Sequence, residues 1–217
     1  MQTDFGRHGG FWEQSVFAAL ICLLAIPLTL ASAARIRDYR SGESIWRDTI
    51  QKAPANPRGW CNCALAVLHD DSNPDVAGRY AAAEPLLATA VELKPDYAAA
   101  HQALGSLLLK SDPVRSRRHL EEAVRLRPRN APSRHALGTM LLRIDPIAAE
   151  RHLAAAVELD PRSTDSLVNL ANLLLARGET GRALELYRRA LAVDPDHPLA
   201  RHNLDAVQRR AAAEASP

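Results

Sequence analysis

Val91-Glu-Leu-Lys-Pro95 is a short helical phrase that ends on a proline, and it recurs three more times in the chain. The later copies are Val124-Arg-Leu-Arg-Pro128, Val157-Glu-Leu-Asp-Pro161 and Leu191-Ala-Val-Asp-Pro195, and an alanine precedes every copy. The four prolines follow one another at steps of 33, 33 and 34 residues. A fixed period in this range is typical of stacked repeats. The phrase therefore predicts an all-α superhelix in which each proline ends a helix and turns the chain into the next repeat.

The composition agrees with a helical array and limits the functions to consider. The chain has 217 residues, of which 47% are hydrophobic, 24% are charged and only 5% are aromatic. Few aromatic residues beside abundant alanine and leucine favour closely packed helices. A net charge of +2 without a basic stripe interleaved with aromatic residues predicts no nucleic-acid partner. Three cysteines, two of them only two residues apart, form no disulfide framework.

An uncharged stretch precedes the repeats. Residues 15–34 read SVFAALICLLAIPLTLASAA, and twenty helical residues span about 30 Å, the thickness of a bilayer hydrocarbon core. Trp12 and Tyr39 lie just outside its two ends, where interfacial aromatic residues often occur. We expect a single transmembrane helix over 15–34, preceded by a loosely ordered segment over 1–14.

Two features leave the fate and the orientation of this stretch open. Ala31-Ser32-Ala33 would suit a signal peptidase, so a secreted or periplasmic protein is the alternative to a retained single-pass anchor. We favour the anchor, because the run is long for a signal core and Glu13 adjoins it. One basic residue precedes the stretch and five lie between 35 and 52, which predicts a cytoplasmic repeat domain.

The repeats divide into regular units. Residues 41–56 form the second helix of a half-repeat, residues 57–196 form four full repeats, and residues 197–213 form a capping helix. The first step between equivalent small residues, from Ala64 to Gly105, is 41 residues, whereas the later steps are 33. The difference is an insertion at 69–78, rich in Asp, Asn, Pro and Gly, which predicts a protruding loop.

The pattern resembles the tetratricopeptide repeat (TPR) family over about 41–210. Leu104-Gly105 and Leu137-Gly138 match the Leu-Gly pair of its first helix, and 180–190 match its second helix closely, with Tyr187 at the later aromatic position. Trp60 matches the early aromatic position, which His101, Arg134 and Leu167 occupy in the following repeats. The resemblance implies a TPR solenoid that binds a protein or peptide partner.

The junction of 35–58 with the apolar stretch is similar to that in multi-span membrane proteins that carry a C-terminal TPR array. In that group the membrane part resembles a lipid-linked-sugar glycosyltransferase, and the repeats lie on the non-cytoplasmic side. The resemblance implies an accessory TPR domain of such a system as an alternative function. It also opposes the charge bias, and of the two we favour the extracytoplasmic side.

The sequence contains no motif for catalysis or for binding a cofactor. There is no nucleophile elbow, HExxH, CxxC, P-loop or GxGxxG. His119 and His152 occupy equivalent places in neighbouring repeats, too far apart to share one ion, and we expect both on the outer surface. The sequence therefore predicts no enzyme activity, no cofactor, no metal and no small-molecule substrate.

The first helices of the repeats should line the concave surface of the array. Projecting them predicts a mixed groove with a leucine in a similar place on every layer, which suits an extended peptide with apolar anchors. Cys61 and Leu65 both project into this groove, at the places where a carboxylate clamp would need lysine and asparagine. The predicted groove residues are Arg58, Leu65, Leu68, Gln102, Ser106, Leu109, His135, Thr139, Leu142, Val168, Asn172 and Leu175.

Overall fold

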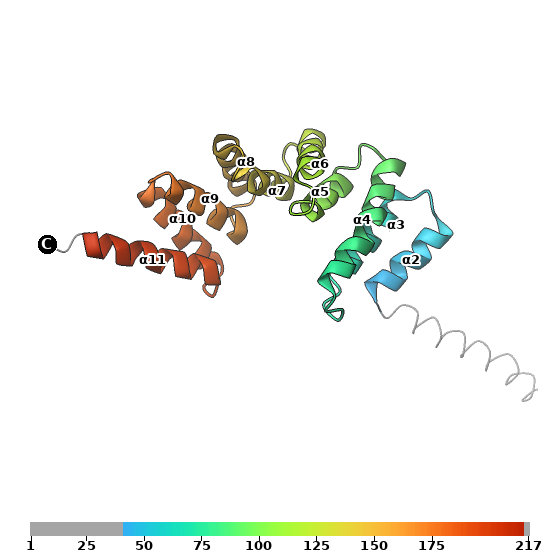
Figure 1. Cartoon of the computed structure of the whole chain (residues 1–217), viewed down its shortest axis with the longest axis horizontal. Coiled ribbons are helices and arrows are strands. Elements are labelled where there is room, and N and C mark those ends of the chain that lie inside the picture. Colours follow the sequence, from blue (N-terminus) through green and yellow to red (C-terminus); the bar gives the residue numbers. More distant parts are fainter. Residues whose placement is uncertain (1–40, 215–217) are drawn as a thin grey trace, which may run out of the picture.

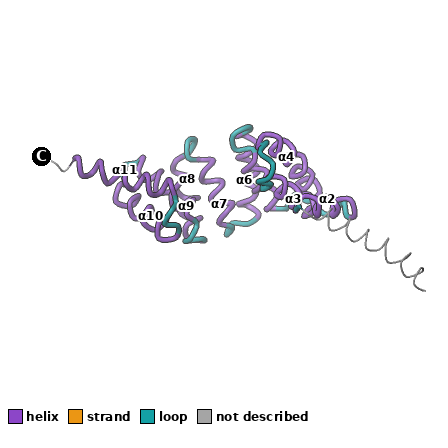
Figure 2. Tube along the Cα trace, turned by 90° about the horizontal axis from the view of Figure 1, so that it is seen from below, coloured by secondary structure: helices purple, strands orange, loops and turns teal. Residues whose placement is uncertain are grey.

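The computed structural model describes residues 41–214 of the chain. The predicted loose segment 1–14 and transmembrane helix 15–34 lie outside the described residues. Within 41–214, no helix is long and apolar enough to cross a membrane. The described part is entirely helical, with turns and short loops between the helices and no strand among these residues (Figure 2).

Ten helices follow one another along the described chain, stacked in order from α2 to α11 (Figure 1). They are α2 (Gly42–Lys52), α3 (Pro57–Leu68), α4 (Val76–Leu93), α5 (Ala98–Leu107), α6 (Pro113–Leu126), α7 (Ala131–Leu141), α8 (Pro146–Leu159), α9 (Thr164–Ala176), α10 (Thr180–Val193) and α11 (Pro198–Glu214). The helices α3 to α10 form four antiparallel pairs, while α2 and α11 flank them as single helices. This confirms the all-α superhelix.

Small residues let the two helices of a pair approach closely. A Cβ added to Gly105 would lie 2.6 Å from Leu120 Cγ, and one added to Gly138 would lie 2.7 Å from Leu153 Cγ. Both leucines are fully buried. The sequence therefore places glycine where the first helix of a pair rests directly on a large core side chain of the second.

The helix ends follow local signals. The Asp112 and Asp145 carboxylates accept hydrogen bonds from the backbone N–H groups of Arg115 and Ala148 at 3.0 and 2.9 Å, as expected of N-caps. Gly178, just after α9, has a φ of +79°, which glycine adopts without steric cost. The insertion is shorter than predicted, because Asp75 caps α4 and the helix begins at Val76 rather than at Arg79.

One recurring hydrogen bond explains how non-aromatic residues replace the early aromatic residue of the repeat. A side-chain N–H donates to the carbonyl of the closing proline six residues earlier. The pairs are Trp60 with Pro54 (2.7 Å), His101 with Pro95 (2.9 Å), Arg134 with Pro128 (2.8 Å) and Arg201 with Pro195. At these four positions an N–H donor reaches the turn. Leu167 cannot donate, and it is fully buried in the core instead.

The buried side chains form two clusters. The N-terminal cluster contains Cys61, Leu87, Leu104 and their neighbours in α3, α4 and α5. The C-terminal cluster runs from Leu120 in α6 to Ala200 in α11 and includes the fully buried Tyr187. The boundary between the clusters falls within the repeat formed by α5 and α6.

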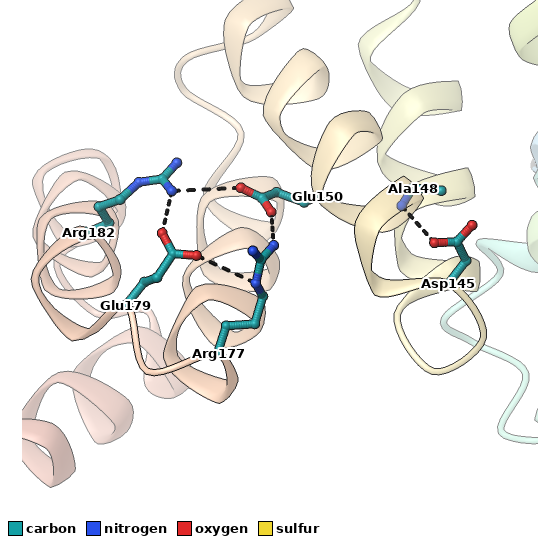
Figure 3. Close-up of polar contacts among 6 residues, drawn as sticks. All are labelled: Asp145, Ala148, Glu150, Arg177, Glu179 and Arg182. Carbon is teal, nitrogen blue, oxygen red and sulfur yellow. Dashed lines mark hydrogen bonds and ion pairs between the residues drawn. The ribbon is translucent and has the colours of Figure 1, made fainter.

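A network of ion pairs ties the third repeat to the fourth (Figure 3). Glu150 on α8 pairs with Arg177, which follows α9, and lies 3.7 Å from Arg182 on α10. Both arginines also pair with Glu179, in the turn between α9 and α10. The four groups alternate in charge, so the network links three helices on the outside of the array.

Candidate functional site: the row of first helices

Side chains of neighbouring first helices are hydrogen-bonded to one another in the C-terminal half of the array. His135 Nδ1 on α7 lies 2.9 Å from Ser166 Oγ on α9, and the Asn169 amide on α9 donates to Thr139 Oγ1 on α7 at 3.1 Å. These bonds hold two predicted groove residues, His135 and Thr139, between α7 and α9. Both side chains remain partly exposed.

Asn172, on α9, is the most firmly oriented of the predicted groove residues. Its side-chain oxygen accepts a hydrogen bond from the Tyr187 hydroxyl on α10 and another, at 2.8 Å, from the Asn203 amide on α11. Two donors on one oxygen fix which way the amide points. The NH₂ group of Asn172 makes no hydrogen bond within the described residues, and the side chain is only half-buried. It can therefore donate to a ligand.

The N-terminal layers are built differently. Arg58 is exposed on α3, and the Gln102 amide on α5 donates to Ser106 Oγ one turn later, at 3.2 Å. Leu65 and Leu68 pack against the N-terminal core cluster. Among the described residues within α3 and α5, no side chain of one helix is hydrogen-bonded to the other, and the nearest polar contact joins Cys61 on α3 to Tyr97, the N-cap residue of α5.

The leucines predicted to anchor a peptide are only partly available. Leu109, Leu142 and Leu175 all pack against the C-terminal core cluster, and each keeps part of its surface exposed. Only the exposed part of each leucine side chain is therefore available for apolar contact with a peptide.

Two positions of the projected surface are wrong. Val168 is 2% exposed and lies within the C-terminal core cluster, and Cys61 is 1% exposed within the N-terminal one. Both lie on the face of the first helix that packs against its own partner helix. A projection at 100° per residue does not separate this face sharply from the neighbouring one.

Burial affects the ionisation of His135, the histidine among the predicted groove residues. It lowers the pKa of His135, and the nearby Asp165 carboxylate opposes this effect more weakly. The imidazole is therefore neutral at neutral pH. Its Nδ1 and the Ser166 hydroxyl can exchange a hydrogen bond without an ionic partner.

The two equivalent histidines of the second helices are not surface residues as predicted. His119 and His152 are each half-buried, because each packs on the residue that binds the proline carbonyl. His119 Nδ1 lies 3.1 Å from His101 Nδ1, while His152 Nδ1 lies 3.4 Å from an Arg134 guanidinium nitrogen. Each histidine thus has its own partner, and within 41–209 no group of three or more His, Cys, Asp or Glu side chains is arranged to hold a metal.

Sequence reasoning missed the residues that hold the groove together. Ser166, Asn169 and Asn203 were not predicted, although each is bonded to a predicted residue. Their signal lies in the spacing. The bonded pairs are separated by 31, 30 and 31 residues, which is the repeat period less about one helical turn. Polar residues at this offset would have identified the contacts between neighbouring first helices.

Comparison with known proteins agrees with this architecture. Residues 141–206 match the sequence profile of the family described as tetratricopeptide repeat. A search of curated proteins found no significant match.

Solved structures share the fold at low sequence identity. The structure of PilF from Pseudomonas aeruginosa superposes with a TM-score of 0.64 at 20% identity, covering 75% of this chain and 72% of that one. A MamA structure gives a TM-score of 0.56 at 20% identity, covering 63% of this chain and 81% of its own. MamA from Desulfovibrio magneticus RS-1 gives 0.59 at 17% identity, covering 78% and 94%. These likenesses concern the fold alone.

Proposed function

We propose that this chain, which carries tetratricopeptide repeats, is a non-enzymatic scaffold that binds an extended peptide of a partner protein along its first helices. The observation that carries the proposal is the orientation of Asn172. Its oxygen is occupied by Tyr187 and Asn203, so its NH₂ is presented as a fixed donor. A fixed donor suits the backbone carbonyl of an extended peptide, and prior ordering lowers the cost of binding.

The neighbouring groups fit the same ligand. His135 and Thr139 are held one layer away by Ser166 and Asn169, and Leu142 and Leu175 offer apolar edges beside them. Polar groups that fix orientation and apolar contacts that exclude water are the usual parts of a peptide-binding surface. The peptide is therefore centred on α7, α9 and α11 rather than on α3 and α5.

The test uses a substitution that changes only the donor. Asn172→Asp keeps an oxygen for Tyr187 and Asn203 and replaces the NH₂ group by a second oxygen. A random peptide library displayed on phage is selected on the full chain, and the enriched peptide is measured by fluorescence anisotropy. We expect Asn172→Asp to weaken binding by about tenfold or more, the loss of a well-placed hydrogen bond together with repulsion of the peptide carbonyl.

A matched control separates this effect from added charge. Gln208→Glu makes the same amide-to-carboxylate change at an exposed position of α11 and should leave the affinity unchanged. The proposal is wrong if no peptide is enriched, or if Asn172→Asp binds as tightly as the parent chain. Substituting Leu109 and Leu142 by glutamate would be less informative, because both side chains pack on the core and such changes also destabilise the fold.

We further propose that residues 15–34 are a retained single-pass membrane anchor with the repeats on the extracytoplasmic side. The support is the absence of charge over twenty residues, with Trp12 and Tyr39 at the two ends. The anchored chain should resist extraction of membranes with carbonate. Its intact mass should include residues 1–33, and a mature chain that begins at Ala34 would instead establish cleavage.

A further inference from the structure

The charge of the chain is concentrated in one repeat-length segment. Residues 113–143, which contain α6 and α7, carry eight arginines and two glutamates, a net charge of +6. The rest of the chain holds 19 basic and 23 acidic residues, a net charge of −4. The small overall charge of +2 therefore hides a basic centre between two weakly acidic regions.

The arginines of α6 line two hollows, one on each side of the helix. A hollow of about 720 Å³ is bordered by Arg115, Arg118, His119, Arg125 and, from α5, His101. A second, of about 410 Å³ between α6 and α8, is bordered by Arg117, Arg125 and Arg151 and also by the acidic Glu121 and Asp145. We name this pair of hollows and the α6 side chains between them the α6 basic face. It is centred on the second helix α6, and none of the predicted groove residues borders it.

The ion pairs of these arginines indicate which ligand groups the α6 basic face can bind. Arg115 is paired with Glu84 at 2.9 Å, Arg117 with Glu121 at 2.7 Å, and Arg125 with Glu122 at 2.6 Å. These guanidinium groups thus already meet carboxylates at the surface. Arg118 borders the larger hollow, is exposed, and makes no hydrogen bond or ion pair within the described residues. It offers a free guanidinium to a carboxylate from outside.

We propose that the α6 basic face binds an acidic peptide segment of a partner protein, with one acidic side chain in the larger hollow against Arg118. Hollows of this size accept individual side chains, which a flat bilayer surface does not supply. Glu121 and Glu122, which border the same hollow, repel a continuous polyphosphate chain such as a nucleic acid. Separated carboxylates avoid these glutamates and reproduce the pairing that the neighbouring arginines already make.

The neighbouring histidine does not supply this charge at neutral pH. Burial lowers the pKa of His119, and His101, Arg115 and Arg118 lower it further. The larger hollow is also faced by Glu121 and Glu122, and Glu84 of α4 holds Arg115 at its edge. Arg118 is therefore the principal attractive group for an incoming carboxylate.

The experiment measures binding of a labelled peptide to the full chain in detergent. The probe is a fluorescein-labelled ten-residue peptide of alternating glutamate and serine, and the control peptide carries glutamine in place of glutamate. We expect the glutamate peptide to bind in low salt, the glutamine peptide not to bind, and affinity to fall as salt rises. Arg115→Glu with Arg118→Glu should weaken binding by about tenfold or more.

A charge-matched variant tests whether the effect is local. Arg188→Glu with Arg189→Glu reverses two exposed arginines of α10, changes the total charge equally, and should alter the affinity by less than about twofold. Circular dichroism confirms that both double variants keep their helices. The proposal is overturned if the two pairs weaken binding equally, or if the glutamate peptide does not bind.

Two further probes address other anionic partners. Glycerophosphoglycerol, the headgroup of phosphatidylglycerol, and a single-stranded ten-nucleotide DNA are offered to the same proteins in the same detergent. The proposal expects the parent chain to bind both more weakly than the glutamate peptide. If either binds more tightly and is lost in Arg115→Glu with Arg118→Glu, the face serves lipid or nucleic acid and the peptide assignment is wrong.

Discussion

The N-terminal and C-terminal core clusters use the same repeat in different ways. In the N-terminal cluster, half of the ten buried residues are alanines and the largest side chains are leucines. The C-terminal cluster has 19 buried residues, among them nine leucines and the fully buried Tyr187. Among the described residues, side chains within successive first helices bond to one another only between α7 and α9 and between α9 and α11, and the ion-pair network around Glu150 lies in the same half.

The difference indicates that regular spacing does not by itself produce a recognition surface. Both halves have the small residue of the first helix, the core residue of the second and the closing proline. Among the described residues, the C-terminal half alone bonds its polar groove residues to a neighbouring first helix, because Ser166, Asn169 and Asn203 reach across to the preceding helix. The profile match at 141–206 lies in this half. The peptide-binding surface that we propose lies in the same half.

The largest expected effect would come from removing Tyr187. Tyr187→Ala deletes a fully buried aromatic ring and should destabilise the C-terminal half by about 3–5 kcal/mol. Because repeats contact only their neighbours, the N-terminal half should be affected less. Urea unfolding followed by circular dichroism should show the loss. Tryptophan fluorescence in a Trp12→Phe background reports on Trp46 and Trp60 and should move less.

Leu87→Ala is the matched change in the N-terminal cluster. It removes a fully buried leucine and should shift the tryptophan signal by a destabilisation of about 2–5 kcal/mol. If both substitutions shift both signals equally, the two clusters unfold as one unit and the comparison between them fails.

The next largest expected effect is a dependence of stability on pH that is stronger in the C-terminal half than in the N-terminal half. Burial lowers the pKa of His119, His135 and His152, all of them in α6, α7 or α8. The unfolded chain, with imidazoles near 6.5, then binds protons before the folded chain does. Stability is therefore complete above pH 6.5 and is lost as the pH falls below it, by at most about 1.4 kcal/mol per pH unit for each histidine.

Urea midpoints between pH 7.5 and 5 would measure this loss. Circular dichroism should show that the urea midpoint falls with pH. In the variant with His119→Gln, His135→Gln and His152→Gln, the midpoint should depend less on pH. The tryptophan signal of the N-terminal half should change little over the same range. A dependence that persists in the triple variant would assign the loss to other groups.

Much of the fold could be predicted from sequence, because each signal for it is local. Asp112 and Asp145 identify helix starts, Gly178 a helix end and Gly105 a close helix contact, each from a few neighbouring residues. The sequence predicts helices over 113–126, 146–159 and 180–193, and α6, α8 and α10 have these bounds. The start of α4 was wrong because Asp75, within a run of turn-forming residues, was assigned to the loop rather than to a cap.

The candidate site could be predicted only in part, because its geometry depends on contacts between repeats. The first-helix positions of Asn172 and Thr139 followed from the period alone. Whether such a side chain is hydrogen-bonded to the next helix depends on Asn203 or Asn169, about thirty residues away. Val168 was misplaced because it is 2% exposed although it lies one helical turn before the half-buried Asn172, so helical periodicity alone does not separate the two positions. The predicted span and its orientation stay predictions.

A smaller change would test the orientation of the Asn172 amide without removing a buried ring from the core. Tyr187→Phe keeps the ring and removes the hydroxyl that donates to Asn172, at an expected cost of about 1 kcal/mol. The Asn172 amide keeps the bond from Asn203 but loses one of the two bonds that fix its orientation. Peptide affinity should then fall by a few fold, less than with Asn172→Asp. An unchanged affinity in anisotropy would show that Asn203 alone fixes the amide.

The smallest expected effect concerns the ion-pair network, which is the other feature confined to the C-terminal half. Glu150→Gln removes the carboxylate that joins Arg177 and Arg182, both of which keep Glu179 as a partner. These groups are partly exposed, so solvent and salt screen them, and the loss should be no more than about 1 kcal/mol. Glu185→Gln on α10, an exposed carboxylate with no ion pair within the described residues, is the control.

A difference between the two variants in urea unfolding at low salt that vanishes near 1 M sodium chloride would establish an electrostatic contribution. A difference that survives high salt would mean that Glu150 stabilises the junction between the repeats through packing.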